Sequence, residues 1–230
     1  MKNTEINRAV VQKIALALGE LNERVVFVGG AVVSLYIDDP AADDVRPTKD
    51  LDISLEIASI AELEELRVLL NKKGFVQSHN DDVMCRFRFE DVKVDVMATR
   101  AIDWAPANPW FAPGFKKKQI YALEAVKIWL LPLPYFLATK YSAFDSRGRK
   151  DPRTSHDFED IVYLLNYTST LKEQVVQSDR EVKAYLQECF TEIINSDILQ
   201  EAILGNLFYE EQKTRYPKII SDLKAITNGI

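Results

Sequence analysis

Residues 46–56 read RPTKDLDISLE, and their pattern decides what kind of fold the chain adopts. Between residues 49 and 56, leucine and isoleucine alternate with Asp50, Asp52 and a serine, which is the period of a strand with one apolar and one polar face. Carboxylates at positions i and i+2 of a strand point to the same face, with α-carbons about 7 Å apart. Two such groups can converge on one hard cation. The stretch therefore predicts a strand that presents paired acids.

Two further motifs flank this strand in the sequence. Residues 28–36 read VGGAVVSLY, in which an apolar run ends at Gly29 and Gly30 and a helical pattern follows. Residues 91–99 read DVKVDVMAT and form the second arm of a predicted hairpin. Asp95 lies between two valines in this arm, so its side chain projects to the opposite face. Because an unpartnered carboxylate on so apolar a strand is costly, we expect a cation beside it.

The three motifs together predict chemistry at phosphorus. Magnesium prefers oxygen ligands, and carboxylates on neighbouring strands provide them. A pair of magnesium ions roughly 4 Å apart can stabilise both the attacking and the leaving oxygen of a displacement at phosphorus. Glycines before a helix allow the backbone to approach a triphosphate. A Gly-Gly pair alone marks a turn more often than a phosphate site, so the prediction of phosphoryl or nucleotidyl transfer depends on the combination.

This combination resembles the polymerase-beta-like nucleotidyltransferases, whose signature is a glycine turn, an Asp-x-Asp strand and a third acid on a later strand. The sequence is most similar to the AbiEii-like branch, the toxin component of type IV toxin–antitoxin systems. Residues 137–165, LATKYSAFDSRGRKDPRTSHDFEDIVYLL, strengthen the resemblance. They are similar to the later motif of that branch, in which a helical lysine precedes an arginine-rich turn and an Asp-x-x-Asp helix.

The resemblance implies roles for the residues of the first three motifs. Asp50 and Asp52 would bind the metal, and Asp95 would bind metal or activate the attacking hydroxyl. Gly29 and Gly30 would hold the triphosphate of the nucleotide. These assignments make Mg²⁺ the expected cofactor and an NTP the expected substrate.

The resemblance also implies roles outside the acid cluster. Lys140 would reach the phosphates or the base region of the nucleotide, and Asp157, with Asp160 one turn later, would support the site from the helical region. Ala31 stands where many active members carry a phosphate-binding serine, and Ser34 is the candidate substitute. Phosphate binding therefore rests on fewer residues than metal binding.

The remaining patterns define the architecture. Residues 5–19 have the spacing of an amphipathic helix, and residues 38–47 form an acidic, proline-containing insertion before the paired acids. From about residue 133 onward the pattern is helical. We predict an α+β fold, in which a nucleotidyltransferase-type mixed sheet flanked by helices is followed by a helical C-terminal domain. The predicted domains are residues 1–125 for the core and residues 126–230 for the helical domain.

The charge of the chain does not decide whether the molecule that receives the nucleotide is a nucleic acid. The formal net charge of −6 argues against a broadly basic surface for nucleic acid. Two local basic clusters exist, at residues 116–118 and at Arg147, Arg149 and Arg153. The arginines are equally compatible with a solvated turn and with contacts to an RNA backbone.

Cysteine and histidine content restricts the metal and the compartment. Cys85 and Cys189 are the only cysteines and read as reduced core residues. The chain has only two histidines, His79 and His156. It therefore cannot assemble a Cys/His zinc cluster by itself, and its metal must be oxygen-bound. No stretch reaches the roughly 18 uncharged apolar residues of a spanning helix. We expect a cytoplasmic protein without a membrane span.

The expected reaction is magnesium-dependent transfer of an NMP from an NTP to an acceptor hydroxyl. By resemblance, the acceptor is RNA or tRNA, and the partner that controls the protein is an antitoxin. One alternative is a small-molecule nucleotidyltransferase of the antibiotic-modifying type, which the negative net charge favours. Another is a catalytically silent module that keeps the fold and binds a partner, which Ala31 favours.

Overall fold

The computed structural model describes residues 2–48, 50–57, 59–78, 81 and 83–229. Lys49 and His79 lie outside the described residues. The chain divides into two compact units. The first unit comprises Met1–Ser34 and Asp44–Pro132, and the second comprises Leu35–Asp43 and Leu133–Ile230.

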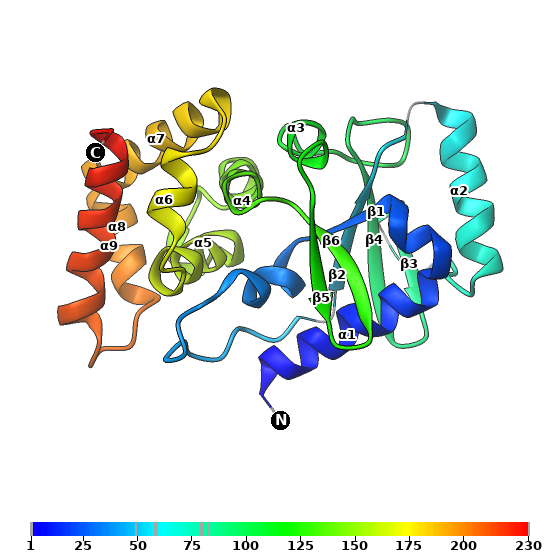
Figure 1. Cartoon of the computed structure of the whole chain (residues 1–230), viewed down its shortest axis with the longest axis horizontal. Helices are drawn as coiled ribbons and strands as arrows, with labels where there is room; N and C mark the ends of the chain where they lie inside the picture. Colours follow the sequence, from blue (N-terminus) through cyan, green and yellow to red (C-terminus); the bar gives the residue numbers. More distant parts are fainter. Residues whose placement is uncertain (1, 49, 58, 79–80, 82, 230) are drawn as a thin grey trace. The chain divides into compact units, whose positions relative to one another are not determined.

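A mixed six-stranded sheet forms the centre of the first unit, with the strand order β3-β4-β2-β1-β6-β5 (Figure 1). Strand β1 runs antiparallel to β2 and parallel to β6, while β2 runs parallel to β4. The sheet and its flanking helices confirm the predicted fold class. The strands are β1 (Val25–Val28), β2 (Asp50–Leu55), β3 (Arg86–Phe89), β4 (Val92–Ala98), β5 (Gln119–Leu123) and β6 (Val126–Leu130).

Helix α1 (Asn3–Leu18) packs against β6 and is the helix that the N-terminal spacing predicts. Val11 and Ile14 lie on its buried face, whereas Ile6 is exposed. The unit also contains η1 (Gly19–Arg24), α2 (Ile60–Lys72) and α3 (Phe111–Phe115), while η2 (Gly30–Tyr36) begins in this unit and ends in the second.

Helix α2 begins after a serine cap and is followed by a left-handed glycine. The Ser59 side chain accepts a hydrogen bond from the backbone N–H of Glu62, as expected for an N-cap. Gly74, with a φ of 88°, follows the helix in the left-handed conformation that glycine adopts readily. By contrast, the segment after Gly29 is the 3-10 helix η2 rather than an ordinary α-helix.

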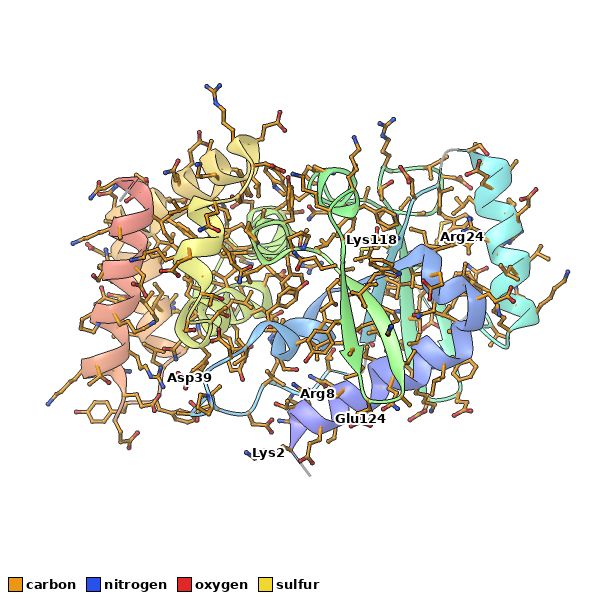
Figure 2. All side chains as sticks on the ribbon, in the orientation of Figure 1. Lys2, Arg8, Arg24, Asp39, Lys118 and Glu124 are labelled. Atoms are coloured by element: carbon orange, nitrogen blue, oxygen red, sulfur yellow. The ribbon has the colours of Figure 1, made fainter. Side chains whose placement is uncertain are left out.

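The hairpin of β5 and β6 was not predicted. Strand β5 lies at the sheet edge with mostly exposed residues, so its sequence lacks the alternation of a half-buried strand. Glu124, labelled in Figure 2, lies in the turn with a positive φ of 46°, where Gly or Asn is the usual signal. The predicted boundary at residues 125 and 126 falls inside this hairpin, and β6 pairs with β1 and β5 of the first unit.

The second unit is helical, as its sequence pattern indicates. Large aromatic side chains fill its core, with Phe144 packed on Phe158 at a centroid distance of 5.0 Å. Helix α4 is buried over most of its length. The helices are α4 (Leu133–Arg147), η3 (Pro152–Thr154), α5 (His156–Tyr167), α6 (Leu171–Val176), α7 (Arg180–Asn195), α8 (Asp197–Gly205) and α9 (Gln212–Thr227).

Residues 35–43 leave the first unit and pack on the helices of the second. The Tyr36 ring stacks on Phe136 with a centroid distance of 4.3 Å. Asp39 forms an ion pair with Arg215 at 2.7 Å, and the Tyr167 hydroxyl donates a hydrogen bond to Asp43. The predicted insertion therefore belongs in part to the helical unit, which the sequence alone did not indicate. Among the described residues, none of the helices has the length and apolarity of a membrane-spanning segment.

Both cysteines are buried free thiols, as predicted. Burial raises the pKa of Cys85 to about 11 and that of Cys189 to about 12, and the Asp95 carboxylate adds to the shift at Cys85. The folded chain therefore keeps protons that unfolded thiols release above about pH 9. From there toward pH 11 these thiols lower the free energy of unfolding as pH rises.

We predict that iodoacetamide at pH 8 labels the native protein at least about 100-fold more slowly than the urea-unfolded chain, because burial raises the pKa of both thiols and leaves few thiolates at this pH. Mass spectrometry of timed samples measures both rates, and Cys85→Ser and Cys189→Ser assign them to a residue. Equal labelling rates with and without urea would contradict the buried placement.

Candidate active site

Gly29 follows β1 and lies against an aspartate of the neighbouring strand. Val28 pairs with Asp52 in the antiparallel register of β1 and β2. Gly29 has a φ of 74°, in the left-handed region that side chains disfavour. A Cβ atom at Gly29 would lie 1.8 Å from Asp52 Oδ2. The missing side chain therefore leaves the space that the Asp52 carboxylate fills.

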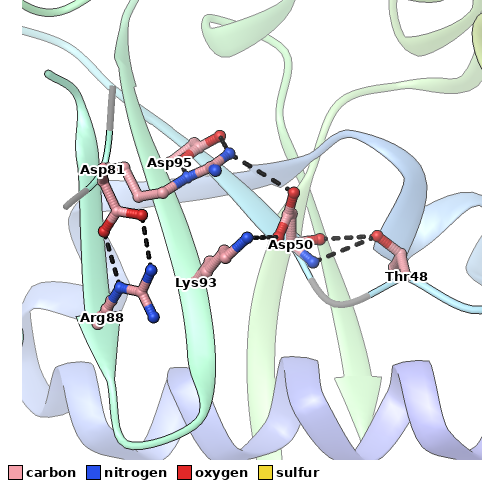
Figure 3. Close-up of polar contacts among 7 residues, drawn as sticks. Thr48, Asp50, Asp81, Arg88, Lys93 and Asp95 are labelled. Atoms are coloured by element: carbon pink, nitrogen blue, oxygen red, sulfur yellow. Dashed lines mark hydrogen bonds and ion pairs between the residues drawn. The ribbon is translucent and has the colours of Figure 1, made fainter. Parts of the chain in front are cut away.

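The parallel register of β2 and β4 brings the three predicted acids together. Asp52 pairs with Asp95, and Asp50 pairs with Lys93. Figure 3 shows Asp50, Lys93 and Asp95 at this part of the sheet. Paired residues on neighbouring strands lie about 4.8 Å apart, with side chains on the same face. This face is half-buried, whereas the opposite face is fully buried. The buried residues that alternate with the acids are Leu51, Ile53, Val94 and Val96.

Arg86 on β3 provides the cation that the apolar surroundings of Asp95 require. Its Nε and Nη2 atoms donate to Oδ1 and Oδ2 of Asp95, both at 2.7 Å. Nη2 also lies 3.5 Å from Asp50 Oδ2, and Lys93 Nζ lies 3.9 Å from Asp50 Oδ1. The hydrogen bonds to Asp95 raise the pKa of Arg86 further, so its charge is permanent. The three carboxylates thus share one face of the sheet with Arg86 and Lys93.

The residue types of this cluster fit a divalent cation. Carboxylate oxygens on adjacent strands are the donors that Mg²⁺ prefers, and the space at Gly29 admits the carboxylate of Asp52. The carboxylates of Asp50 and Asp95, however, are directed at the Arg86 guanidinium. Among the described residues, no group of three or more acids, cysteines or histidines is arranged around a metal position. Both oxygens of Asp95 accept hydrogen bonds from the guanidinium, which accounts for this arrangement.

The residues predicted to bind phosphate, Gly29, Gly30 and Ser34, lie just before η2 or within it. Gly30 is the first residue of this 3-10 helix, and Ser34 is buried within it. Among the described residues, Ser34 Oγ has no hydrogen-bond partner. Its role in phosphate binding stays a prediction.

Lys140 has a partner inside its own unit. Its Nζ atom lies 2.6 Å from Asp160 Oδ2, and the two side chains are only 6% and 5% exposed. The ammonium also lies 5.7 Å from the centre of the Phe136 ring. A buried ion pair of this kind joins α4 to α5. This ion pair does not show whether Lys140 contacts a nucleotide, and that contact stays a prediction.

Asp157 lies in the first turn of α5 and forms two hydrogen bonds with Arg147, at 2.7 and 3.0 Å. Ser155 caps this helix by accepting a hydrogen bond from the backbone N–H of Phe158. The other arginines of the turn also have acidic partners. Arg149 pairs with Asp145 and Glu192, and Arg153 pairs with Asp151. Local acids therefore offset much of the positive charge that the sequence gathers there.

Arg86 was not identified as a site residue from the sequence, although a signal existed. The turn at Glu90 and Asp91 connects β3 to β4, and pairing outward from it places Arg86 opposite Asp95. An arginine opposite an aspartate in an antiparallel pair is within reach of an ion pair. Counting the register from the predicted turn would have found this contact.

A glycine turn, an Asp-x-Asp strand and a third acid on the parallel neighbour, combined in one mixed sheet, define a nucleotidyltransferase core. The chain is similar in fold to the antibiotic-resistance factor ANT(2'')-Ia, with a TM-score of 0.50 and 14% identity over 85% of this chain and 97% of that chain. A nucleotidyltransferase-like antigenic protein from Paracoccidioides brasiliensis has a TM-score of 0.48 and 16% identity over 86% of this chain and 92% of that chain.

The family model of the nucleotidyl transferase AbiEii toxin of type IV toxin–antitoxin systems matches residues 14–227. The chain belongs to this family and is a nucleotidyltransferase. Membership implies a nucleotide substrate and an antitoxin partner. The resemblance predicted from the sequence motifs is thereby confirmed. No curated protein sequence matches the chain.

We predict that Gly29→Ala lowers the free energy of unfolding by about 2–4 kcal/mol, because it combines a left-handed backbone with overpacking against Asp52. Urea unfolding measures the change. Gly205→Ala is the matched control, since a Cβ atom at Gly205 would meet no atom within 4 Å. Equal unfolding midpoints for Gly29→Ala and the wild type would contradict the close approach to Asp52.

We predict that Lys140→Met destabilises the protein by about 3–5 kcal/mol, because it removes the cation that neutralises the buried Asp160 carboxylate. Adding Asp160→Leu should restore most of the loss, since an apolar pair replaces the ion pair. Urea unfolding of the single and double variants gives both values. A single variant as stable as the wild type would show that the ion pair is absent in solution.

Proposed function

We propose that this nucleotidyltransferase moves an NMP from an NTP to an acceptor hydroxyl in a magnesium-dependent reaction. The observation that supports this most is the register of Asp52 with Asp95, with Asp50 on the same face of the sheet. The space at Gly29, which the Asp52 carboxylate fills, supports it further. A solvated sheet face would need neither the parallel pairing of acids nor a glycine beside them.

In the proposed reaction, Asp50 and Asp52 would hold Mg²⁺, which would supply the positive charge that neutralises the triphosphate. The acceptor oxygen attacks the α-phosphorus, the bond to the bridging oxygen breaks, and pyrophosphate leaves. Asp95 either joins the metal ligands or accepts the proton of the attacking hydroxyl. The backbone of Gly29 and Gly30 approaches the phosphates closely because neither residue has a side chain in the way.

We propose that the helical region contributes Lys140 and Asp157 to the reaction, as the family resemblance implies. Their ion pairs with Asp160 and Arg147 give each residue a structural role as well. The two roles are separable, because a double variant that restores stability still lacks the lysine. Transfer activity of the stable double variant therefore reports on Lys140 as a substrate contact.

We propose RNA, and tRNA in particular, as the acceptor, with an antitoxin that suppresses the activity in the cytoplasm. Family membership in type IV toxin–antitoxin systems supports this choice. The rival acceptor is a small cationic molecule such as an aminoglycoside. The net charge of −6 and the acid partners of Arg149 and Arg153 favour that rival. Labelled NTPs offered with RNA and with aminoglycosides in parallel would decide between them.

We predict that an NTP with Mg²⁺, at about 100 times its Kd, raises the melting temperature of the wild type by about 5–10 °C. Asp50→Asn with Asp52→Asn should abolish this rise and the transfer of label, because the metal ligands are lost. Differential scanning fluorimetry and a radiolabel assay measure the two effects.

Glu90→Gln with Asp91→Asn is the matched control, because it removes the same charge from the exposed turn between β3 and β4. This control should respond to nucleotide as the wild type does. If no NTP shifted the wild type, the silent binding module would become the better account of the chain.

A further inference from the structure

We propose that Arg86 is an internal cation that occupies the acid cluster until a divalent cation binds, so that metal binding requires its release from Asp95. This inference rests on the proposed function, because it concerns the same carboxylates. The Arg86 guanidinium lies between two of the three acids, at 2.7 Å from Asp95 and 3.5 Å from Asp50. The guanidinium thus contacts the same carboxylates that would ligate a shared metal ion.

The two cations exclude each other at Asp95 for geometric and electrostatic reasons. The guanidinium uses both oxygens of Asp95 as acceptors. A magnesium ligand distance is about 2.1 Å, so a metal on either oxygen would lie close to the guanidinium nitrogens. Arg86 and Asp95 are only 16% and 13% exposed, so solvent screens this repulsion poorly. The bidentate ion pair must therefore open before Asp95 can join a metal.

The neighbouring cations are not equivalent to Arg86. Arg88 lies on the same face two residues along β3, and its bidentate partner is Asp81 at 2.7 Å (Figure 3). Lys93 lies 3.9 Å from Asp50 and is more exposed than Arg86. A fork with two short hydrogen bonds holds a carboxylate more firmly than one distant ammonium does. Arg86 is therefore the cation whose removal should change metal affinity.

A nucleotide would relieve the competition. Guanidinium groups bind phosphate oxygens in the same forked geometry that they use for carboxylates. A triphosphate that enters with the metal offers Arg86 a new anionic partner, so the release from Asp95 is compensated. Metal and NTP binding should then be positively coupled, each strengthening the other by the same factor. Arg86 would act as a positioning residue that keeps the free protein from binding metal tightly.

The test measures Mn²⁺ binding to the full-length chain, stripped with EDTA and without nucleotide, by the electron paramagnetic resonance signal of unbound Mn²⁺. We expect Arg86→Met to bind Mn²⁺ at least about tenfold more tightly than the wild type. Arg88→Met, the matched control, should change the affinity by about twofold or less. In the presence of a saturating NTP, the difference between Arg86→Met and the wild type should shrink. Equal or weaker Mn²⁺ binding by Arg86→Met would overturn the proposal, as would equal tightening by Arg88→Met.

Two further variants secure the interpretation. Arg86→Lys keeps the charge but loses the fork, so its Mn²⁺ affinity should lie between those of the wild type and Arg86→Met, and it carries the test if Arg86→Met fails to fold. Adding Asp50→Asn and Asp52→Asn to Arg86→Met should abolish the tight binding. Tight binding that survived these changes would locate the metal elsewhere and overturn the proposal.

The outcomes also separate this inference from the proposed function. Tighter Mn²⁺ binding by Arg86→Met, without any nucleotidyl transfer by the wild type, would support the role of Arg86 and contradict the proposed reaction. Transfer by the wild type, with unchanged Mn²⁺ affinity in Arg86→Met, would support the reaction and contradict the role of Arg86.

Discussion

The parallel pairing of β2 with β4 is the constraint on which the site depends. Its register buries the apolar side chains of both strands on one face, and this leaves the acids on the other. A slip of one residue would turn Asp52 or Asp95 into the core and expose the apolar residues, so burial itself specifies the register. The hydrophobic effect thus aligns two carboxylates that repel each other.

The same arrangement explains the unusual residues around the cluster. Asp52 can lie beside β1 only because Gly29 has no side chain. Asp95 can lie on an apolar strand only because the hairpin register places Arg86 opposite it. The negative charge of the acids also affects a nearby thiol, since Asp95 contributes to the raised pKa of Cys85. Each local feature follows from gathering negative charge on a partly buried face.

The sequence predicted those parts of the fold that rest on local patterns. Alternation with a period of two found β2 and β4, and the helical spacing of residues 5–19 found α1. What it missed lies at a sheet edge or depends on contacts between distant segments. Strand β5 is exposed at a sheet edge, so nothing in its own residues indicated a strand. The packing of residues 35–43 on the helical unit depends on partners such as Arg215, far along the chain.

The energetics of the cluster bear on whether the chain is an enzyme or a silent module. A partly buried ion pair adds little net stability, because desolvation offsets much of the attraction between the charges. Apolar residues on this face would hold β3 and β4 together at least as well. Stability alone therefore does not require the ion pair of Asp95 with Arg86. This ion pair and the contact of Gly29 with Asp52 lie at the proposed metal site, so the physical chemistry of the cluster favours catalysis over a binding module that only keeps the fold.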